Sequence, residues 1–173
     1  MKKITSIISL IFVLGLGTLN HFMYDWFPYP IVGLFTPVNE SIFEHLKLVF
    51  YPFLIISIIR FIFIKSNYYF VKVSLSSVAG ILTIPILYYL IKIFVTPPAF
   101  INIAIFVLAA IIQEFIFYKL INDSNATYPI KNPEGIIVIF TIFLAFSVFT
   151  FIPPKFDLFL DPSTNTYGIY NEK

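Results

Sequence analysis

The fold is decided by the stretch FINIAIFVLAAIIQEFIFYKL, residues 100–120, which is apolar almost throughout. A helix that crosses a bilayer needs about 20 predominantly apolar residues. This stretch has the length and the composition, so it predicts a transmembrane helix.

Four more stretches share this character. They run from about residue 4 to 20, 41 to 64, 69 to 93 and 135 to 152. Prolines lie in the gaps between the later stretches, where a helix should end, and Pro85 predicts a kink inside the third stretch. The fold class we expect is all-α, an integral membrane bundle of about five transmembrane helices. Residues 1–173 would form a single polytopic domain with a tail over 153–173.

The overall composition agrees with this architecture. The chain is 59% hydrophobic and 12% charged, with a mean hydropathy of +0.92, whereas a soluble domain is nearer half apolar and a quarter charged. The net charge is +2 and there is no cysteine, so nucleic acid is not an expected partner and thiolate metal sites are excluded. The expected partner is the lipid bilayer, and a homo-oligomer or another membrane protein stays open. The bias towards Ile, Phe, Asn and Lys favours a bacterial source.

The orientation follows from lysine and arginine, which are enriched on the cytoplasmic side. Five spans with a cytoplasmic N-terminus place seven of these residues inside and four outside. The sequence therefore predicts a multi-pass protein of the cell membrane with its N-terminus inside and its C-terminal tail outside.

Three polar segments then share the outer side of the membrane. They are HFMYDW at 21–26, PVNESIFEHLK at 37–47, and the region from 157 to 168. Both histidines and six of the nine acids lie in or beside them. Imidazole together with carboxylate is a ligand set suited to Zn, Mn or Fe.

These segments supply the residues of a metal-dependent site. We expect His21, His45 and Asp161 as metal ligands, and Glu44, Glu40 and Asp25 as catalytic carboxylates. The divalent cofactor would be a metal such as Zn or Mn. Glu40 and Glu44 lie four residues apart on one helix face, so they repel unless Lys47 or a metal ion lies between them.

Simpler interpretations compete with this one. Ser41 and Glu44 have the spacing of a capping box at a helix start. His21 lies where an aromatic belt meets the membrane surface, and Asp161-Pro162 is typical of a turn in which Asp bonds to its own backbone.

Glu114 is the one acid well inside an apolar stretch. Unpaired charges in lipid are costly. Arg60 is expected at a similar depth, so we predict an intramembrane Arg60–Glu114 ion pair.

The three outer segments carry a resemblance. The patterns HFxYDW at 21–26, PxNESxxEHxKL at 37–48, and Asp161-Pro162 followed by Tyr167-Gly168-Ile169 resemble those of an uncharacterised family of small bacterial multi-spanning membrane proteins. The resemblance implies a polytopic membrane protein over nearly the whole chain and carries no activity.

Three functions remain open at this point. The first is a membrane-embedded, metal-dependent hydrolase acting on a lipid or envelope substrate at the outer face. The second is a small transporter or ion-coupled permease, in which the outer groups, with Glu114 and Arg60, mark a polar path. The third is a non-catalytic accessory protein.

Overall fold

Five long helices build the fold over residues 3–170, the part of the chain that the computed structural model describes. They are α1 (Lys3–Trp26), α4 (Lys47–Phe63), α5 (Tyr69–Lys92), α6 (Ala99–Asn122) and α7 (Asn132–Phe151). Two short helices, α2 (Pro30–Gly33) and α3 (Ile42–His45), lie between α1 and α4. After α7 come a 3-10 turn at Asp157–Phe159 and a hairpin of β1 (Leu160–Asp161) and β2 (Thr166–Tyr167).

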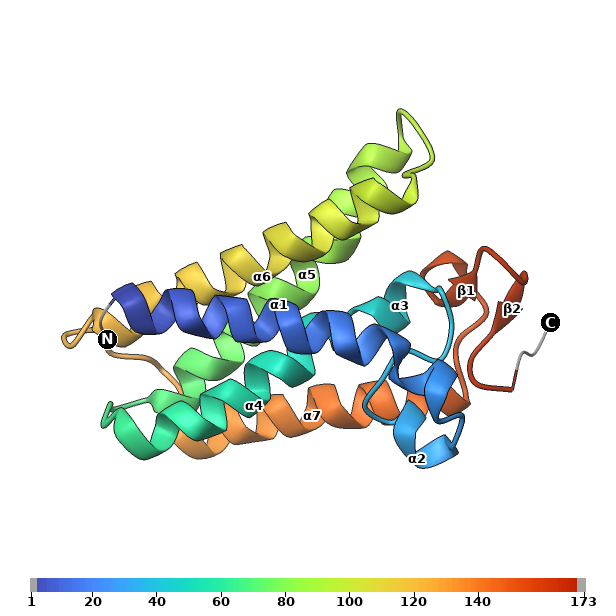
Figure 1. Cartoon of the computed structure of the whole chain (residues 1–173). Coiled ribbons are helices and arrows are strands. Elements are labelled where there is room, and N and C mark those ends of the chain that lie inside the picture. The colour runs from blue at the N-terminus through green and yellow to red at the C-terminus, as the bar shows by residue number, and fades with distance from the viewer. Residues whose placement is uncertain (1–2, 171–173) are drawn as a thin grey trace.

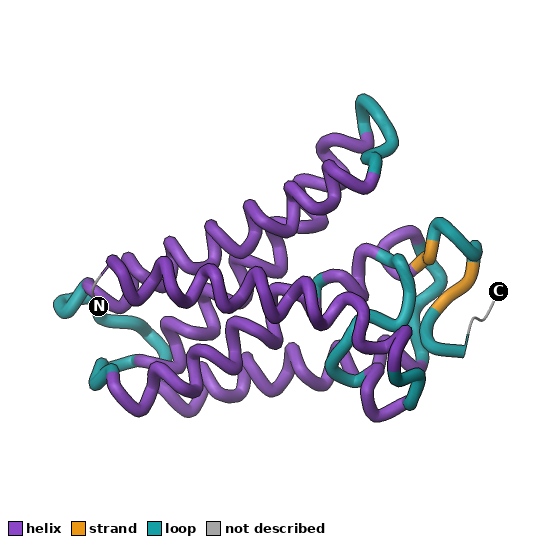
Figure 2. Tube along the Cα trace, viewed as in Figure 1, coloured by secondary structure: helices purple, strands orange, loops and turns teal. Residues whose placement is uncertain are grey.

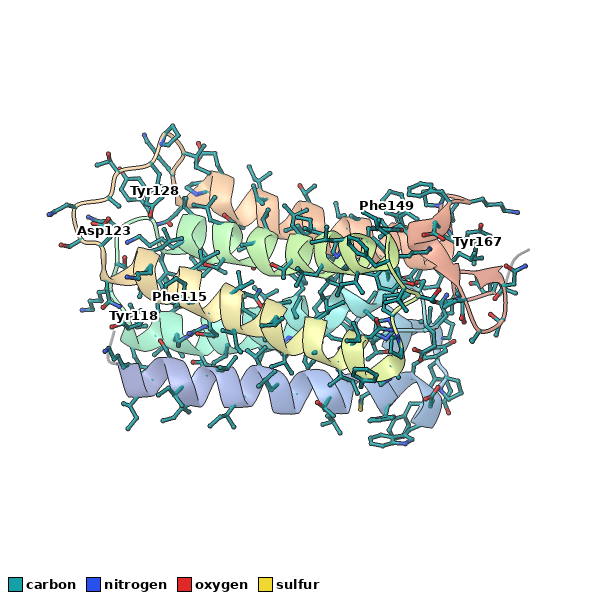
Figure 3. All side chains as sticks on the ribbon, turned by 90° about the horizontal axis from the view of Figure 1, so that it is seen from above. Phe115, Tyr118, Asp123, Tyr128, Phe149 and Tyr167 are labelled. Atoms are coloured by element: carbon teal, nitrogen blue, oxygen red, sulfur yellow. The ribbon has the colours of Figure 1, made fainter. Side chains whose placement is uncertain are left out.

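The helices are long and apolar enough to cross a membrane, counting α3 and α4 together as one candidate span from Ile42 to Phe63. Many large apolar side chains point outward, among them Phe63, Phe94 and Phe100. Figure 3 shows such side chains along the helices, with Tyr118 and Asp123 at one end of the bundle and Phe149 and Tyr167 at the other. The predicted all-α fold class is therefore confirmed, and its helices are compatible with lipid contact.

A proline explains how closely two of the helices approach. Pro52 lies inside α4 and has no N–H, so the carbonyl of Leu48 one turn earlier loses its helical donor. That carbonyl oxygen faces Gly17 of α1, where an added Cβ would lie only 2.8 Å from it. The small residue at 17 thus lets α1 pack against the free carbonyl.

The short elements gather at one end of the bundle. Figure 1 shows α2, α3 and the β1–β2 hairpin beside the C-terminal end of α1, while the start of α1 lies at the opposite end. Figure 2 shows most of the non-helical chain at this same end. The α5–α6 hairpin leans away from the other helices, and its tip stands apart from β1–β2. The three polar segments of the sequence are therefore neighbours in space.

Hydrogen bonds from backbone and side-chain groups attach the C-terminal segment to the bundle. Ile169 N–H donates to the carbonyl of Thr150 at the end of α7 (2.9 Å). The Asn39 side chain donates to the carbonyl of Gly168 (3.2 Å). The predicted Asp161 turn is confirmed, because Ser163 N–H donates to the Asp161 carboxylate (2.8 Å).

Gly168→Ala is expected to loosen this segment. Gly168 has φ +61°, and an added Cβ would lie 2.8 Å from the Thr150 carbonyl oxygen. The left-handed conformation alone should cost about 1–2 kcal/mol. Limited proteolysis in detergent should show faster cleavage after α7. Gly15→Ala is the control, since a Cβ there meets nothing within 4 Å, and equal cleavage of both variants would contradict the expectation.

Candidate functional site

Glu40 lies between the two histidines at the end of the bundle where the short elements gather. Its carboxylate oxygens are 3.5 Å from His45 Nε2 and 3.9 Å from His21 Nε2. The two imidazole rings lie 5.3 Å apart between centroids. Over residues 3–170 these three residues are the one group of three His, Cys, Asp or Glu whose ligand atoms all lie within 4.8 Å of one another.

The imidazole of His45 is oriented by its own helix. The ring belongs to α3, and Nδ1 lies 2.8 Å from the carbonyl oxygen of Ser41. A carbonyl can only accept a hydrogen bond, so Nδ1 donates to it, and Nε2 is the ring nitrogen that faces Glu40. Histidines that bind metals commonly donate their other ring N–H to a backbone carbonyl in this way.

His21 is held less firmly. It lies near the end of α1, which extends through the whole HFMYDW segment. Its Nδ1 is buried and has no hydrogen-bond partner among the described residues. Unlike the ring of His45, this ring therefore has no hydrogen bond at Nδ1 within the described residues that fixes its orientation.

The distances can be compared with those of a bound metal. Zinc binds His nitrogen and carboxylate oxygen at about 2.0–2.2 Å in tetrahedral geometry, which separates neighbouring ligand atoms by about 3.3–3.5 Å. The Glu40–His45 distance of 3.5 Å already fits. The contact of 3.9 Å from His21 reaches the other carboxylate oxygen of Glu40, and the three ligand atoms lie within 4.8 Å of one another, so the side chains must close by up to about 1.3 Å to hold one ion.

Asp161 is not among the three ligand residues, but its carboxylate binds the backbone of Glu40. Its carboxylate accepts hydrogen bonds from the Ser163 N–H and hydroxyl (2.8 and 2.7 Å) and from the backbone N–H of Glu40. Burial raises the pKa of the Asp161 carboxyl, but these hydrogen bonds outweigh burial and hold the pKa below its usual value. Asp161 thus fixes the loop that carries Glu40.

Glu44 belongs to a separate, buried network. Its carboxylate lies 2.6 Å from Lys47 Nζ and accepts from the Thr150 hydroxyl (2.8 Å) and the Val38 N–H (3.0 Å). The two glutamates therefore avoid repulsion through different partners: Lys47 neutralises Glu44, and the histidines face Glu40.

Half of the predicted capping box is present. The Ser41 hydroxyl accepts from Glu44 N–H (3.3 Å). The reciprocal bond is replaced, because Asn39 rather than Glu44 accepts from Ser41 N–H (2.9 Å). Asp25 lies exposed on α1, one turn beyond His21, and is outside the group of three.

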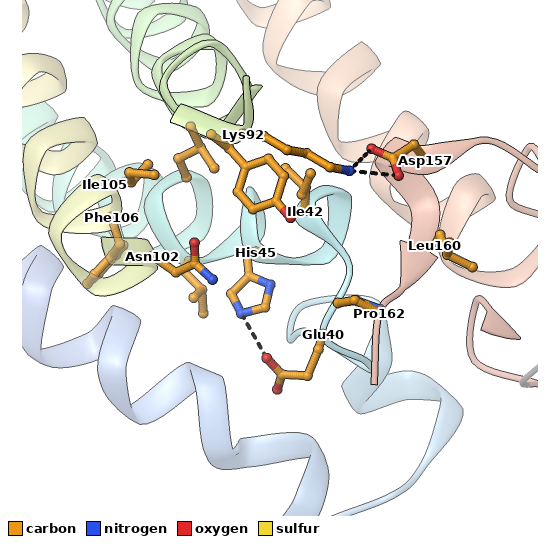
Figure 4. A pocket seen from close by; sticks show the side chains of 13 residues that line it. Glu40, Ile42, His45, Lys92, Asn102, Ile105, Phe106, Asp157, Leu160 and Pro162 are labelled. Carbon is orange, nitrogen blue, oxygen red and sulfur yellow. Dashed lines mark hydrogen bonds and ion pairs between the residues drawn. The ribbon is translucent and has the colours of Figure 1, made fainter. Parts of the chain in front are cut away.

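A cavity of about 150 Å³ adjoins the group, with Glu40 and His45 in its wall. Figure 4 shows His45 and Glu40 on one side, Asn102 beside them, and Lys92 with Asp157 across the cavity. Its other lining residues are mostly apolar: Ile42, Leu48, Ile84, Tyr88, Ile105, Phe106, Leu160 and Pro162.

The sequence did not point to Lys92 as a site residue. Lys92 Nζ, at the end of α5, lies 2.7 and 3.0 Å from the Asp157 carboxylate oxygens. The hydrogen bond from Lys92 holds the pKa of Asp157 below its usual range. The sequence signal for Lys92 was its charge at the outer end of the third apolar stretch. A single sequence does not show that this end of the stretch contacts the tail after α7.

The Arg60 guanidinium and the Glu114 carboxylate form a pair far from this site. The Arg60 Nη1 and Nη2 atoms each lie 3.0 Å from a Glu114 carboxylate oxygen, and both side chains are buried. The guanidinium carbon is 4.3 Å from the centroid of the Phe117 ring. Neither charged residue lines the cavity.

The fold and the site together define a helical protein with five candidate membrane spans and a polar group of two histidines and a glutamate at one end. A sequence model matches residues 1–169 and is described as Family of unknown function (DUF6512). The chain belongs to this family. No curated protein and no solved structure matches the chain.

Proposed function

We propose that this protein is a metal-dependent hydrolase of the cell membrane that acts on a lipid or envelope substrate at the outer face. In this proposal the N-terminus is cytoplasmic and the C-terminal tail extracytoplasmic. The observation that carries the proposal is the convergence of His21, Glu40 and His45 beside a cavity.

The ligand set supports catalysis better than a purely structural metal. Three protein ligands of the type His₂Glu leave a fourth position for water, as catalytic zinc sites do, whereas structural sites are closed by four ligands. A metal at this position would lower the pKa of its bound water and supply hydroxide as a nucleophile. We assign Asp25, which lies one turn beyond His21 on α1, as the carboxylate that accepts the proton.

Transport is less well supported. An ion-coupled permease needs polar groups in both halves of the membrane that face one path. Neither Arg60 nor Glu114 lines the cavity, and the two residues neutralise each other as an ion pair away from it. These contacts favour the hydrolase over the permease.

His45→Gln is expected to abolish metal binding. Purified wild-type protein in detergent should contain about one Zn or Mn ion per chain. The variant should contain almost none, because it loses an imidazole that is one of the three ligands of the ion. Elemental analysis measures the content. Asp157→Asn is the matched control, since it lines the same cavity without belonging to the ligand group.

Two results would separate the hydrolase from an accessory protein. Metal lost in His45→Gln but kept in Asp157→Asn, with both variants folded, would support the site and justify assays on lipid esters. Absence of metal from the wild-type protein after incubation with each ion would overturn the hydrolase. The His–Glu contacts would then be ordinary ion pairs of a non-catalytic protein.

A further inference from the structure

The cavity has charged groups on two opposite sides. Glu40 and His45 lie on one side, and Lys92 with Asp157 lies on the other. These groups come from three parts of the chain: the segment before α4, the end of α5 and the segment after α7. At about 150 Å³ the space is large enough for several water molecules, so a small polar headgroup fits between the two sides.

Lys92 has a donor to spare. An ammonium group carries three N–H donors, and its contacts with Asp157 involve the two carboxylate oxygens. Asp157 holds the lysine in place, and its own side chain is half exposed. A bound anion can therefore accept from Lys92 without first displacing Asp157.

The charge balance indicates an anionic ligand. Among the groups that line the cavity, the charges of Lys92 and Asp157 cancel, and Glu40 would offset one charge of a divalent metal, which would leave one positive charge. A phosphate group has several oxygens that can bind a metal and an ammonium group at once. A fatty acid carboxylate has the charge but no ester bond to hydrolyse.

The rest of the lining is apolar. Leu48, Ile84 and Ile105 are buried walls of the cavity, and Phe106 completes them. Beyond Lys92, the α5–α6 tip exposes Ile93 and Phe94. Apolar surface on both sides of the charged groups suits a hydrocarbon chain attached to the headgroup.

We propose that the substrate is an amphiphile with a phosphate ester headgroup, bound with its phosphate between the His21–Glu40–His45 group and Lys92. The assignment rests on the proposed function. In the reaction, a water oxygen bonds to phosphorus and the ester P–O bond breaks. The alcohol leaves with a proton, and the products are that alcohol and a phosphate.

Binding of phosphatidic acid to the metal-loaded protein in detergent tests this inference. Diacylglycerol supplies the same chains without the phosphate, and inorganic phosphate supplies the anion without chains. Phosphatidic acid should bind more tightly than either. Lys92→Met should weaken its binding about tenfold or more, because a hydrogen bond to a charged group is lost. Lys155→Met removes a charge of the tail that does not line the cavity. This variant should bind phosphatidic acid with unchanged affinity.

Asp157→Asn gives a result of opposite sign. Asparagine keeps an amide oxygen that can accept from Lys92 but removes the negative charge beside it, so binding of phosphatidic acid should tighten, which a merely misfolded variant would not do. Equal affinity of the wild-type protein and Lys92→Met overturns the inference, as does equal affinity for phosphatidic acid and diacylglycerol. Equally tight binding of inorganic phosphate would assign the site to free phosphate and overturn the amphiphile.

Metal content of the same samples separates the two proposals. If the protein holds metal and Lys92→Met binds phosphatidic acid like the wild type, the substrate class is wrong and the hydrolase stands. If the wild-type protein holds no metal, both the proposed hydrolase function and this substrate class are contradicted.

Discussion

Arg60→Met is expected to lower the free energy of unfolding by about 3–5 kcal/mol. The replacement leaves the Glu114 carboxylate buried without its counter-charge and removes two hydrogen bonds of 3.0 Å. It also removes the guanidinium from the face of the Phe117 ring. Denaturant unfolding in mixed micelles measures the change.

The double replacement Arg60→Met, Glu114→Leu is the control. It removes both charges and leaves apolar groups of similar size, which is often close to neutral for a buried ion pair. The double variant should therefore regain most of the free energy of unfolding that the single variant loses. A loss below about 1 kcal/mol in the single variant, the value of an exposed pair, would contradict burial of this pair in the folded protein.

Lys47→Met is expected to have an effect of similar size, about 3–5 kcal/mol. Lys47 is fully buried, and its ammonium group lies within 3.1 Å of four oxygen acceptors, which share its three N–H donors. They are the carbonyls of Gly33 and Thr36, the Glu44 carboxylate and the Thr150 hydroxyl. Methionine fills the space of the stem but leaves Glu44 unpaired and two carbonyls without this donor. Thermal unfolding and protease cleavage near residue 34 should both report the change.

Lys65→Met is the comparison for this experiment. Lys65 is exposed at the other end of the bundle, so its replacement should change stability by less than about 0.5 kcal/mol. If Lys47→Met proves as stable as Lys65→Met, Lys47 does not hold α2, α3 and α7 together.

Hydropathy was sufficient to predict the helices, because a lipid-facing helix must be apolar over its whole length. The start of the second span near residue 41 followed from Ser41, which does cap the helix. The length of α1 beyond residue 20 was harder, since HFMYDW is polar enough to be read as a loop. The segment stays helical to Trp26, and this places His21 beside Glu40.

The site was harder to predict than the fold. Whether Glu44 faces Lys47 or a metal depends on Thr150, which lies 103 residues after Lys47 in the sequence. The same limit applies to Lys92, whose partner Asp157 follows 65 residues later. Sequence spacing describes one helix at a time, and these contacts are set by how separate helices pack.

The bond from Asn39 to Gly168 has a consequence for the order of assembly. The two residues are 129 positions apart, and Asp161, which holds the backbone of Glu40, is also made long after that loop. While the chain is still being translated, the first two spans can insert into the membrane, but the Glu40 loop lacks its anchors. The Glu40 loop can therefore acquire the contacts that fix the His21–Glu40–His45 group only after the segment that follows α7 has been synthesised.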